Sequence, residues 1–571
     1  MRHAALVFSC AATLGLLAGC ATTAAPNAGS ANTSTGKPLT IDVPAVAHPQ
    51  GETPAWWYRS GAARAAGNGA MNGKAKNVIL FLGDGMSLTT VAAARILDGQ
   101  RKGQPGEENS LSWERFPATA LSRTYNTDSQ TPDSAGTMTA ITTGVKSHMG
   151  AIGVYAGHED DCADSLGKQA LTWLELADSA GLATGVVSTA RITHATPAAT
   201  YAHVPDRGWE NDAALPAKAV EQGCKDIAQQ LLSSSRFGRG PQVVLGGGRK
   251  EFITADEADP QQAGKRGLRR DGRDLVAEWK QSHPDGAYVT DAAQLAAAQD
   301  APTLLGLFNY DHMQYDHDRI AAGAIEPSLA DMTRAAISRL SRNPDGYVLM
   351  VEGARIDMAS HEGNAFRALD ETIALSEAVQ AAVDATSAED TLIIVTADHS
   401  HTLNFVGYPV RGNPILDKVR GKTSFDGQPG ELALALDGRP YTTLQYANGP
   451  GNTGASDSQP AGPKRYPHAP KKLLAPAAGR PDLTRIDTAA PDYMQESLVP
   501  LKDESHGGDD VGIWARGPGS EAVRGSVEQN VIYHFIVQAT PKLRARLCAA
   551  GTCDKDGVPV ELPKPGDFEK K

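Results

Sequence analysis

Three apolar runs in this chain are continuous, without the alternation of apolar and polar positions that marks a strand exposed on one face. They span residues 77–82 (NVILFL), 347–351 (YVLMV) and 391–396 (TLIIVT), and each contains β-branched side chains. A continuous run of this length is typical of a parallel strand that helices bury on both faces. The pattern therefore predicts an α/β fold built on parallel strands.

A potential metal ligand ends or follows each of these runs. Asp84, Glu352 and Asp398 take these positions, and His399 comes directly after Asp398. In open α/β sheets, ligands bind outside the carboxyl ends of the strands. We therefore expect the three carboxylates to share one rim of the sheet.

Two further segments supply ligands of the kind that zinc prefers. Asp357 and His361 follow Glu352 with the i, i+4 spacing that places two side chains on one helix face. An exposed Asp–His pair on a helix is the plain alternative for this spacing. His506 lies just before another apolar run, VGIWARG, and completes a three-ligand set. Three protein ligands with one open position are the arrangement of a catalytic zinc.

A candidate nucleophile lies in the segment TPDSAGT, which leads into the predicted helix MTAITTGVK. Ser134 is then near a helix N-terminus, where free N–H groups and the helix dipole favour an alkoxide or a bound phosphate. A helix cap formed by Asp133 or Ser134, with no further role, is the alternative. The segment is thus a candidate for phosphate chemistry only in combination with the ligand motifs.

Length and composition limit the classes of protein that fit. A chain of 571 residues is long for a single core, but α/β enzymes often keep one sheet and grow insertions, so we expect one catalytic domain with an insertion. The formal net charge of −12 argues against nucleic-acid binding, which needs a basic face. An anionic substrate is compatible with this charge if metal ions reverse the field locally.

The N-terminus has the pattern of an export signal. Residues 4–17 are apolar but shorter than the roughly 20 residues that a bilayer-spanning helix needs. The letters LAGC at residues 17–20 resemble the bacterial lipobox, so we expect a signal at residues 1–19 and lipidation of Cys20. An ordinary signal peptide with an incidental cysteine is the alternative. Ala21 favours the outer membrane, by resemblance to sorted lipoproteins.

The residues after Cys20 are small and polar, and they can bury too little apolar surface to form an ordered structure. We expect residues 20–53 to form a tether and a helix to begin at Pro54. Four cysteines remain beyond Cys20, which leaves three pairings open. The short spacing of Cys548 and Cys553 makes a local loop plausible, with Cys162 and Cys224 left over. In an oxidising compartment we expect two structural disulfides.

The motifs in this order resemble the alkaline phosphatase family, from about residue 54 to about residue 553. The motifs that carry the resemblance are GDGM at 83–86, PDSAGT at 132–137, VEGARIDMASHEG at 351–363, TADHSH at 396–401 and ESHGGDDVG at 504–512. The chain is more similar to the animal branch, in which the cysteines would pair as Cys162 with Cys224 and Cys548 with Cys553. The resemblance implies a three-layer α/β sandwich with a large, mostly parallel sheet.

The resemblance also implies two zinc ions and one magnesium ion in each subunit. One zinc would be held by Asp357, His361 and His506, the second zinc by Asp84, Asp398 and His399, and the magnesium by Asp84, Thr196 and Glu352. Asp84 would then bridge two metals with its two carboxylate oxygens. A hydroxyl such as that of Thr196 suits a hard, oxygen-preferring cation.

Four other residues match the phosphate site of the family. Ser134 would be the nucleophile of a phosphoserine intermediate, and Arg207 would clamp two phosphate oxygens with its planar fork. Asp133 would orient Arg207, and His194 would lie close to the magnesium. Met358 departs from the family, which has His or Lys there; a thioether cannot bond to phosphate, so we expect altered phosphate affinity and turnover.

The resemblance divides the mature chain into a catalytic domain at residues 54–401, a crown-like insertion at residues 402–500 and the end of the catalytic domain at residues 501–571. In the family the crown meets a partner subunit, so we expect a homodimer; a monomer with a loose surface loop is the alternative. The expected substrates are small phosphate monoesters. The expected location is the periplasm or the cell surface, with membrane attachment through the lipid.

Two other functions remain in view. A phosphodiesterase or phosphonate hydrolase of the same superfamily would lack the third metal site, whereas Asp84, Thr196 and Glu352 are all present. A sulfatase would need a nucleophile motif that the chain lacks. From a different class, a surface lipoprotein could bind metal or phosphate without catalysis, but the retention of Ser134 and Arg207 argues against it.

Overall fold

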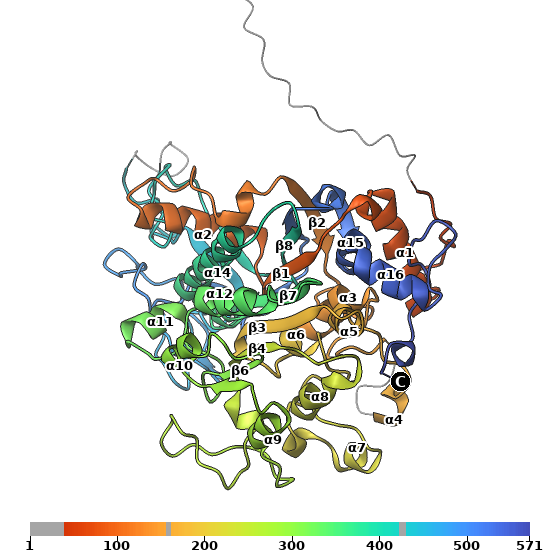
Figure 1. The fold of residues 1–571 in the computed structure, drawn as a ribbon. Helices are drawn as coiled ribbons and strands as arrows, with labels where there is room; N and C mark the ends of the chain where they lie inside the picture. Colours follow the sequence, from red (N-terminus) through yellow and green to blue (C-terminus); the bar gives the residue numbers. More distant parts are fainter. Residues whose placement is uncertain (1–38, 156–161, 422–429, 571) are drawn as a thin grey trace, which may run out of the picture. The chain divides into compact units, whose positions relative to one another are not determined.

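A ten-stranded sheet forms the centre of the computed structural model, which describes residues 39–155, 162–421 and 430–570 (Figure 1). Its strand order is β17-β2-β16-β8-β1-β7-β3-β4-β6-β5. In this order the strands are Gly525–Glu528, Ala118–Arg123, Val511–Arg516, Thr391–Ala397, Asn77–Gly83, Tyr347–Gly353, Ala183–Arg191, Val243–Gly247, Leu304–Leu307 and Ala287–Val289. All neighbouring pairs are parallel except the two that β16 makes. The predicted large, mostly parallel sheet is confirmed.

The three strands predicted from the apolar runs are neighbours at the middle of the sheet. β1 lies between β7 and β8 and pairs with both in parallel. Residues along β1 alternate between two cores: Val78 and Leu80 belong to the one, and Ile79 and Phe81 belong to the other. This alternation explains why the run shows no polar positions, because both faces of the strand are buried.

Helices cover the two faces of the sheet and produce three layers (Figure 1). The helices of one core are α3 (Ser134–Thr143), α5 (Trp173–Ser179) and α15 (Val531–Ala539). The helices of the other core are α2 (Leu88–Arg101), α12 (Leu329–Leu340) and α14 (Ala365–Ala385). Two short helices at the strand ends, α6 (Ala195–Ala198) and α13 (Arg355–His361), carry candidate site residues. The remaining helices are α4 (Cys162–Ser165), α7 (Ala217–Glu221), α8 (Ile227–Ser233), α9 (Leu275–Ser282), α10 (Ala292–Ala297), α11 (Asp316–Ala321) and α16 (Pro541–Ala549).

The N-terminal helix α1 (Pro54–Gly67) packs on α15 of its own chain, and Trp57 is buried there with 3% of its surface exposed. Part of the stretch before α1 also packs on the body, although the sequence predicted a tether through residue 53. Leu39 contacts the small cluster that includes Val558, and the indole N–H of Trp56 donates to the Pro44 carbonyl at 2.8 Å. These contacts correct the expectation for residues 39–53, because the few apolar side chains of this stretch pack on apolar residues of the body.

The region predicted as a crown contains a small three-stranded sheet in the order β10-β11-β14 (Leu403–Phe405, Leu444–Gly449 and Ser497–Pro500) and a two-stranded sheet of β12 and β13 (Ala455–Ser456 and Leu473–Ala475). A short antiparallel pair, β9 (Ser400–His401) with β15 (His506–Gly507), links two of the ligand motifs. From residue 38 onward the chain forms one compact unit. The proposed boundaries at residues 401 and 500 remain predictions.

Both disulfides have the connectivity that the family resemblance implied. Cys162 is bonded to Cys224, and Cys548 is bonded to Cys553. The first bond joins the segments around α4 and α7, and the second closes a loop after α16. In the described ranges of the chain, every helix is too short or too polar to cross a bilayer.

Candidate active site and metal centre

Three carboxylates lie together where β1, β7 and β8 end. Asp84 follows β1, Glu352 lies in β7 and Asp398 follows β8, and all three side chains are fully buried. In the sheet register, Leu82 on β1 is level with Glu352 and with Thr396 on β8. The parallel pairing therefore provides the shared rim that the sequence predicted.

These carboxylates are placed where an anion is unfavourable without a cation beside it. Burial, together with the charge of Asp398, raises the pKa of Asp84 well above its ordinary value, and burial raises the pKa of Glu352 to about 8. Ser188 donates to one Glu352 oxygen, while Oε1 is buried without a hydrogen-bond partner among the described residues. Thr196 Oγ1 lies 3.5 Å from Asp84 Oδ2. This set of oxygen atoms fits a hard divalent cation.

Ser134 is the first residue of α3 and is buried beside this rim. Asp133 caps the helix, since its Oδ1 accepts the N–H of Gly136 at 3.1 Å. Ser134 Oγ lies 3.2 Å from His399 Nε2 and 3.5 Å from Asp84 Oδ1. The capping alternative thus applies to Asp133, and it leaves the hydroxyl of Ser134 facing the metal-type ligands.

The other oxygen of Asp133, the residue before Ser134, holds Arg207 in place. Its Nη1 donates to Asp133 Oδ2 at 3.0 Å, and its Nη2 donates to His194 Nε2 at 3.2 Å. Burial opposes ionisation of Asp133, but Arg207 and the backbone N–H groups of Gly136 and Gly150 together outweigh burial and lower the pKa of this carboxyl. The N–H of Gly150 also donates to Asp133 Oδ2, at 3.1 Å. Asp133 therefore orients a guanidinium whose other N–H groups can bind an anion.

A second group of ligands collects around Asp357 on α13. His361 Nε2 lies 3.2 Å from Asp357 Oδ1, and His506 Nε2 lies 3.3 Å from the same oxygen. The two imidazole nitrogens are 3.0 Å apart. Burial opposes ionisation of Asp357, but the imidazoles, His361 first, hold its pKa well below the ordinary value. Two imidazole nitrogens and a carboxylate at these distances fit a single transition-metal ion.

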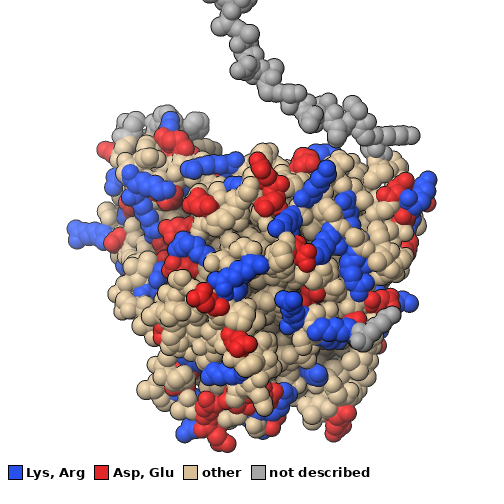
Figure 2. All heavy atoms as spheres, in the orientation of Figure 1, with Lys and Arg blue, Asp and Glu red and all other residues tan. Residues whose placement is uncertain are grey.

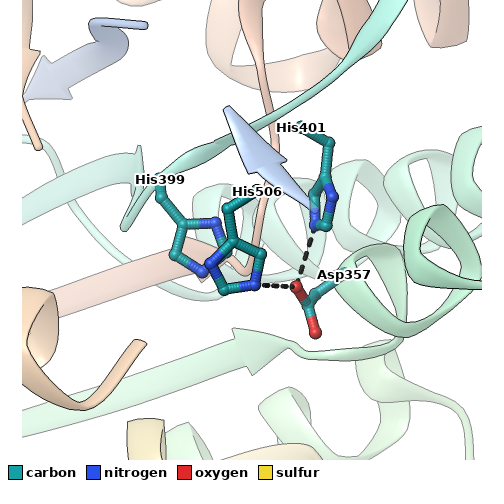
Figure 3. Close-up of side chains that lie close together, drawn as sticks. All are labelled: Asp357, His399, His401 and His506. Atoms are coloured by element: carbon teal, nitrogen blue, oxygen red, sulfur yellow. Dashed lines mark hydrogen bonds and ion pairs between the residues drawn. The ribbon is translucent and has the colours of Figure 1, made fainter. Parts of the chain in front are cut away.

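The two groups meet at His399. Its ring stacks on that of His506, with 3.6 Å between the centroids, and Figure 3 shows the pair beside Asp357. Ligand atoms of Asp84, Asp398 and His399 all lie within 4.8 Å of one another, and His399 also lies within that distance of the group around Asp357. The fold thus brings the six predicted zinc ligands into one continuous site.

Sequence reasoning missed two residues of this site, His401 and Glu504. His401 Nε2 lies 2.8 Å from Asp357 Oδ1, a contact drawn in Figure 3, and its Nδ1 lies 2.5 Å from Glu504 Oε2. The signals were present in the sequence, as the alternation His399-x-His401 at a strand and as the Glu504-x-His506 pair. The sequence does not predict a role for either residue, because local spacing shows neither which imidazole faces a metal nor which histidine Glu504 contacts.

Met358 points toward an apolar cluster. Its Sδ lies 2.8 Å from Arg355 Nη1, and its side chain packs against the cluster of Tyr315, Ala359 and Ala368. The guanidinium of Arg355 lies over the Tyr315 ring at 3.7 Å from the centroid. The side chain therefore packs against this apolar cluster, and among the described residues its sulfur makes no hydrogen bond to Ser134 or Arg207.

Comparisons with known proteins agree with this geometry. The family model described as alkaline phosphatase matches residues 75–541. The tissue-nonspecific alkaline phosphatase isozyme of Gallus gallus is 42% identical over 81% of this chain and 84% of its own length. The same isozyme of Homo sapiens is 40% identical over 81% of this chain and 83% of its own. The alkaline phosphatase of Gadus morhua is 41% identical over 82% of this chain and 92% of its own length.

Solved structures support the fold at lower identity. The alkaline phosphatase of Thermus thermophilus covers 89% of this chain and 100% of its own, with a TM-score of 0.58 at 22% identity. The enzyme of the Antarctic bacterium TAB5 covers 82% of this chain and 99% of its own, with a TM-score of 0.53 at 22% identity. Since the family model spans most of the sequence and the curated relatives are identical to it at two fifths of the aligned residues, this chain belongs to the alkaline phosphatase family.

Proposed function

We propose that this chain hydrolyses phosphate monoesters at the rim of its central sheet, with Ser134 as the nucleophile. Family membership establishes the reaction itself, metal-dependent hydrolysis of phosphate monoesters. The observation that carries the assignment to these residues is the placement of Ser134 Oγ, within 3.5 Å of both His399 Nε2 and Asp84 Oδ1. A hydroxyl among metal-type ligands and at a helix N-terminus is the arrangement that phosphoryl transfer to serine requires.

The proposal includes two zinc ions and one magnesium ion. The ligands would be Asp357, His361 and His506 for one zinc, Asp84, Asp398 and His399 for the other, and Asp84, Thr196 and Glu352 for magnesium. The donor types support this division, since imidazole nitrogens suit zinc and an all-oxygen set suits magnesium. When bound, such ions supply positive charge that activates the nucleophile and stabilises the leaving oxygen.

The side chains of this chain then have separate tasks. Ser134 Oγ forms a bond to phosphorus as the ester P–O bond breaks, and the alcohol leaves. Water then cleaves the phosphoserine, which releases inorganic phosphate and restores the hydroxyl. Arg207 holds two phosphate oxygens through both steps, because Asp133 and His194 fix the direction of its fork.

We also propose that the chain is exported and anchored by a lipid at Cys20, with a signal at residues 1–19. These residues lie outside the described part of the structure. The two disulfides support an oxidising compartment. Figure 2 shows Lys and Arg interspersed with Asp and Glu on the displayed face, in agreement with a small-molecule substrate.

A homodimer formed through the crown is part of the proposal as well. β14 is an edge strand of the crown sheet, and its side chains Leu498 and Val499 are 85% and 49% exposed. Leu501, which follows the strand, is 43% exposed. An exposed apolar edge strand is a liability in a monomer, and a partner subunit would cover it.

The experiment that tests the function compares kcat/KM for p-nitrophenyl phosphate and bis-p-nitrophenyl phosphate. It uses the chain from Ala21 onward, so that no lipid is attached, with zinc and magnesium restored and at several pH values. We expect strong preference for the monoester and an alkaline optimum, since the serine alkoxide is favoured as pH rises. Preference for the diester would assign the chain to a sister family, and no turnover of either would favour a binding protein.

Replacing Met358 with histidine is expected to lower the inhibition constant for inorganic phosphate and to change kcat, because an imidazole adds a donor that a thioether lacks. The change in the inhibition constant is expected to be about tenfold to a hundredfold, since one hydrogen bond to a charged group contributes on the order of 1.5–3 kcal/mol. Product inhibition and kcat are measured together. Unchanged values for both would contradict this prediction, because they would show that a side chain at residue 358 does not reach the phosphate.

A further inference from the structure

Glu504 is a fully buried carboxylate that the proposed reaction does not use directly. Its Oε2 faces His401 Nδ1 at 2.5 Å, and its Oε1 accepts from the N–H and the hydroxyl of Thr402 at 2.7 and 2.5 Å. Both oxygens are therefore occupied, and the side chain has one fixed orientation. A buried charge with this many charge-assisted hydrogen bonds is a rigid support for whatever it contacts.

Through His401 the carboxylate reaches the first proposed zinc ligand. The imidazole lies between Glu504 and Asp357, with Nε2 at 2.8 Å from Asp357 Oδ1. Carboxylates only accept hydrogen bonds, so the ring of His401 donates to both neighbours and has no lone pair left for a metal. His401 thus holds Asp357 Oδ1, the oxygen that also lies 3.2 Å from His361 Nε2 and 3.3 Å from His506 Nε2, and so fixes the carboxylate beside the other two ligands.

The backbone of Glu504 reaches the second proposed ligand. His361 Nδ1 donates to the Glu504 carbonyl at 2.5 Å, and the Glu504 N–H donates to the His361 carbonyl at 2.8 Å. The Nδ1 contact fixes the tautomer of His361 so that Nε2 is the free nitrogen. The third ligand, His506, is two residues further along the same chain, in the strand β15 that pairs with β9 at His401.

We propose that Glu504 is the positioning residue of the zinc site formed by Asp357, His361 and His506. It acts on each of the three ligands by a different route. Its side chain holds Asp357 through His401, and its carbonyl holds His361 directly. The backbone connects it to His506, two residues further on in β15. The inference deepens the proposed function and rests on that ligand set. The ion it serves is a divalent transition metal with mixed imidazole and carboxylate ligation, of which zinc is the expected case.

The test is the affinity for zinc of the variant Glu504→Gln. The glutamine keeps the volume and can still accept from Thr402, but its Nε2 cannot accept a hydrogen bond from His401, so only the side-chain route is broken. We expect the dissociation constant of one of the two zinc ions to rise by about 10-fold to 100-fold, as for other residues that support metal ligands. The readouts are zinc content by mass spectrometry and competition with a chromogenic chelator.

Two companion variants make the outcome specific. His401→Gln interrupts the same route, so the double variant with Glu504→Gln is expected to lose little more affinity than either single variant. Glu175→Gln is the matched control, because Glu175 Oε1 contacts His203 Nε2 at 2.8 Å in a buried pair far along the chain from the zinc ligands. Zinc affinity is expected to remain unchanged in this control even where stability falls.

Saturating zinc is expected to restore the kcat of Glu504→Gln to within a few fold of the parent value, which general damage to the fold would not allow. The proposal is overturned if Glu504→Gln binds zinc as the parent does, or if Glu175→Gln loses affinity equally. A much larger loss in His401→Gln alone would instead make His401 a direct ligand and would also overturn it. Absence of zinc binding or phosphatase activity in the parent protein is a different result, and it would refute the proposed function itself.

Discussion

Replacing Ser134 with alanine is expected to lower kcat/KM for phosphate monoesters at least about a thousandfold, because the variant has no oxygen that can take the phosphoryl group. The remaining groups, Arg207 and the metal ligands, stay in place and still bind phosphate. KM is therefore expected to change far less than kcat. The loss should be accompanied by the disappearance of the covalent phosphoenzyme in a rapid-quench experiment with labelled substrate.

The control for this variant is Ser328→Ala. Ser328 also lies at a helix start, where its hydroxyl accepts the N–H of Asp331 at 3.1 Å as the cap of α12. Its loss is expected to cost about 1 kcal/mol of stability and no activity. If Ser134→Ala retained a labelled phosphoenzyme or more than a few per cent of the parent kcat, another nucleophile would have to be found.

Removal of the divalent metals is expected to abolish activity and to destabilise the fold. Each bound ion contributes about 4 kcal/mol to folding when its free concentration is a thousand times its dissociation constant. The buried carboxylates of Asp84, Glu352 and Asp398 then lose the charge that compensates them. We expect the melting temperature to fall by several degrees after dialysis against a chelator, and activity to return only when zinc and magnesium are both restored.

The metal-free protein is also expected to lose stability as the pH rises. Burial raises the pKa of Glu352 to about 8 in the folded state, whereas an unfolded glutamate has its ordinary value of 4.5. Between these values the unfolded state releases its proton first, so the free energy of unfolding falls from about pH 5 to about pH 8. The holoprotein should lack this slope. Equal pH profiles with and without metal, by calorimetry, would contradict the assignment of Glu352 as a ligand.

Much of the fold follows from local pattern. The runs at residues 77–82, 347–351 and 391–396 correspond to β1, β7 and β8 with one or two residues of difference at the ends. These strands could be predicted because a strand buried on both faces needs an unbroken apolar sequence. The proximity of Asp357 and His361 could also be predicted from local spacing, because one helix, α13, carries both residues.

Other features depend on what the chain meets after folding. Residues 39–53 have the composition of a tether, yet Leu39 and Ile41 dock against Ala62 and Val558. The helix that follows begins at Pro54 as expected, and only the folded structure shows that Trp57 is buried by its own chain. Local composition is the same whether or not apolar residues elsewhere in the fold lie close enough to be contacted, so the sequence could not distinguish these outcomes.

The sequence by itself determined the strands at the centre of the sheet and identified the candidate ligand motifs and the candidate nucleophile that follow them, because strand and helix periodicities are local properties. Only the tertiary structure decided how Glu504 contacts His361, which is 143 residues away, and how His401 comes to lie between Glu504 and Asp357. These contacts join residues from separate motifs. The reason is physical: a hydrogen bond depends on the positions of two groups in space, and the separation of two residues along the chain does not show whether the groups are close together.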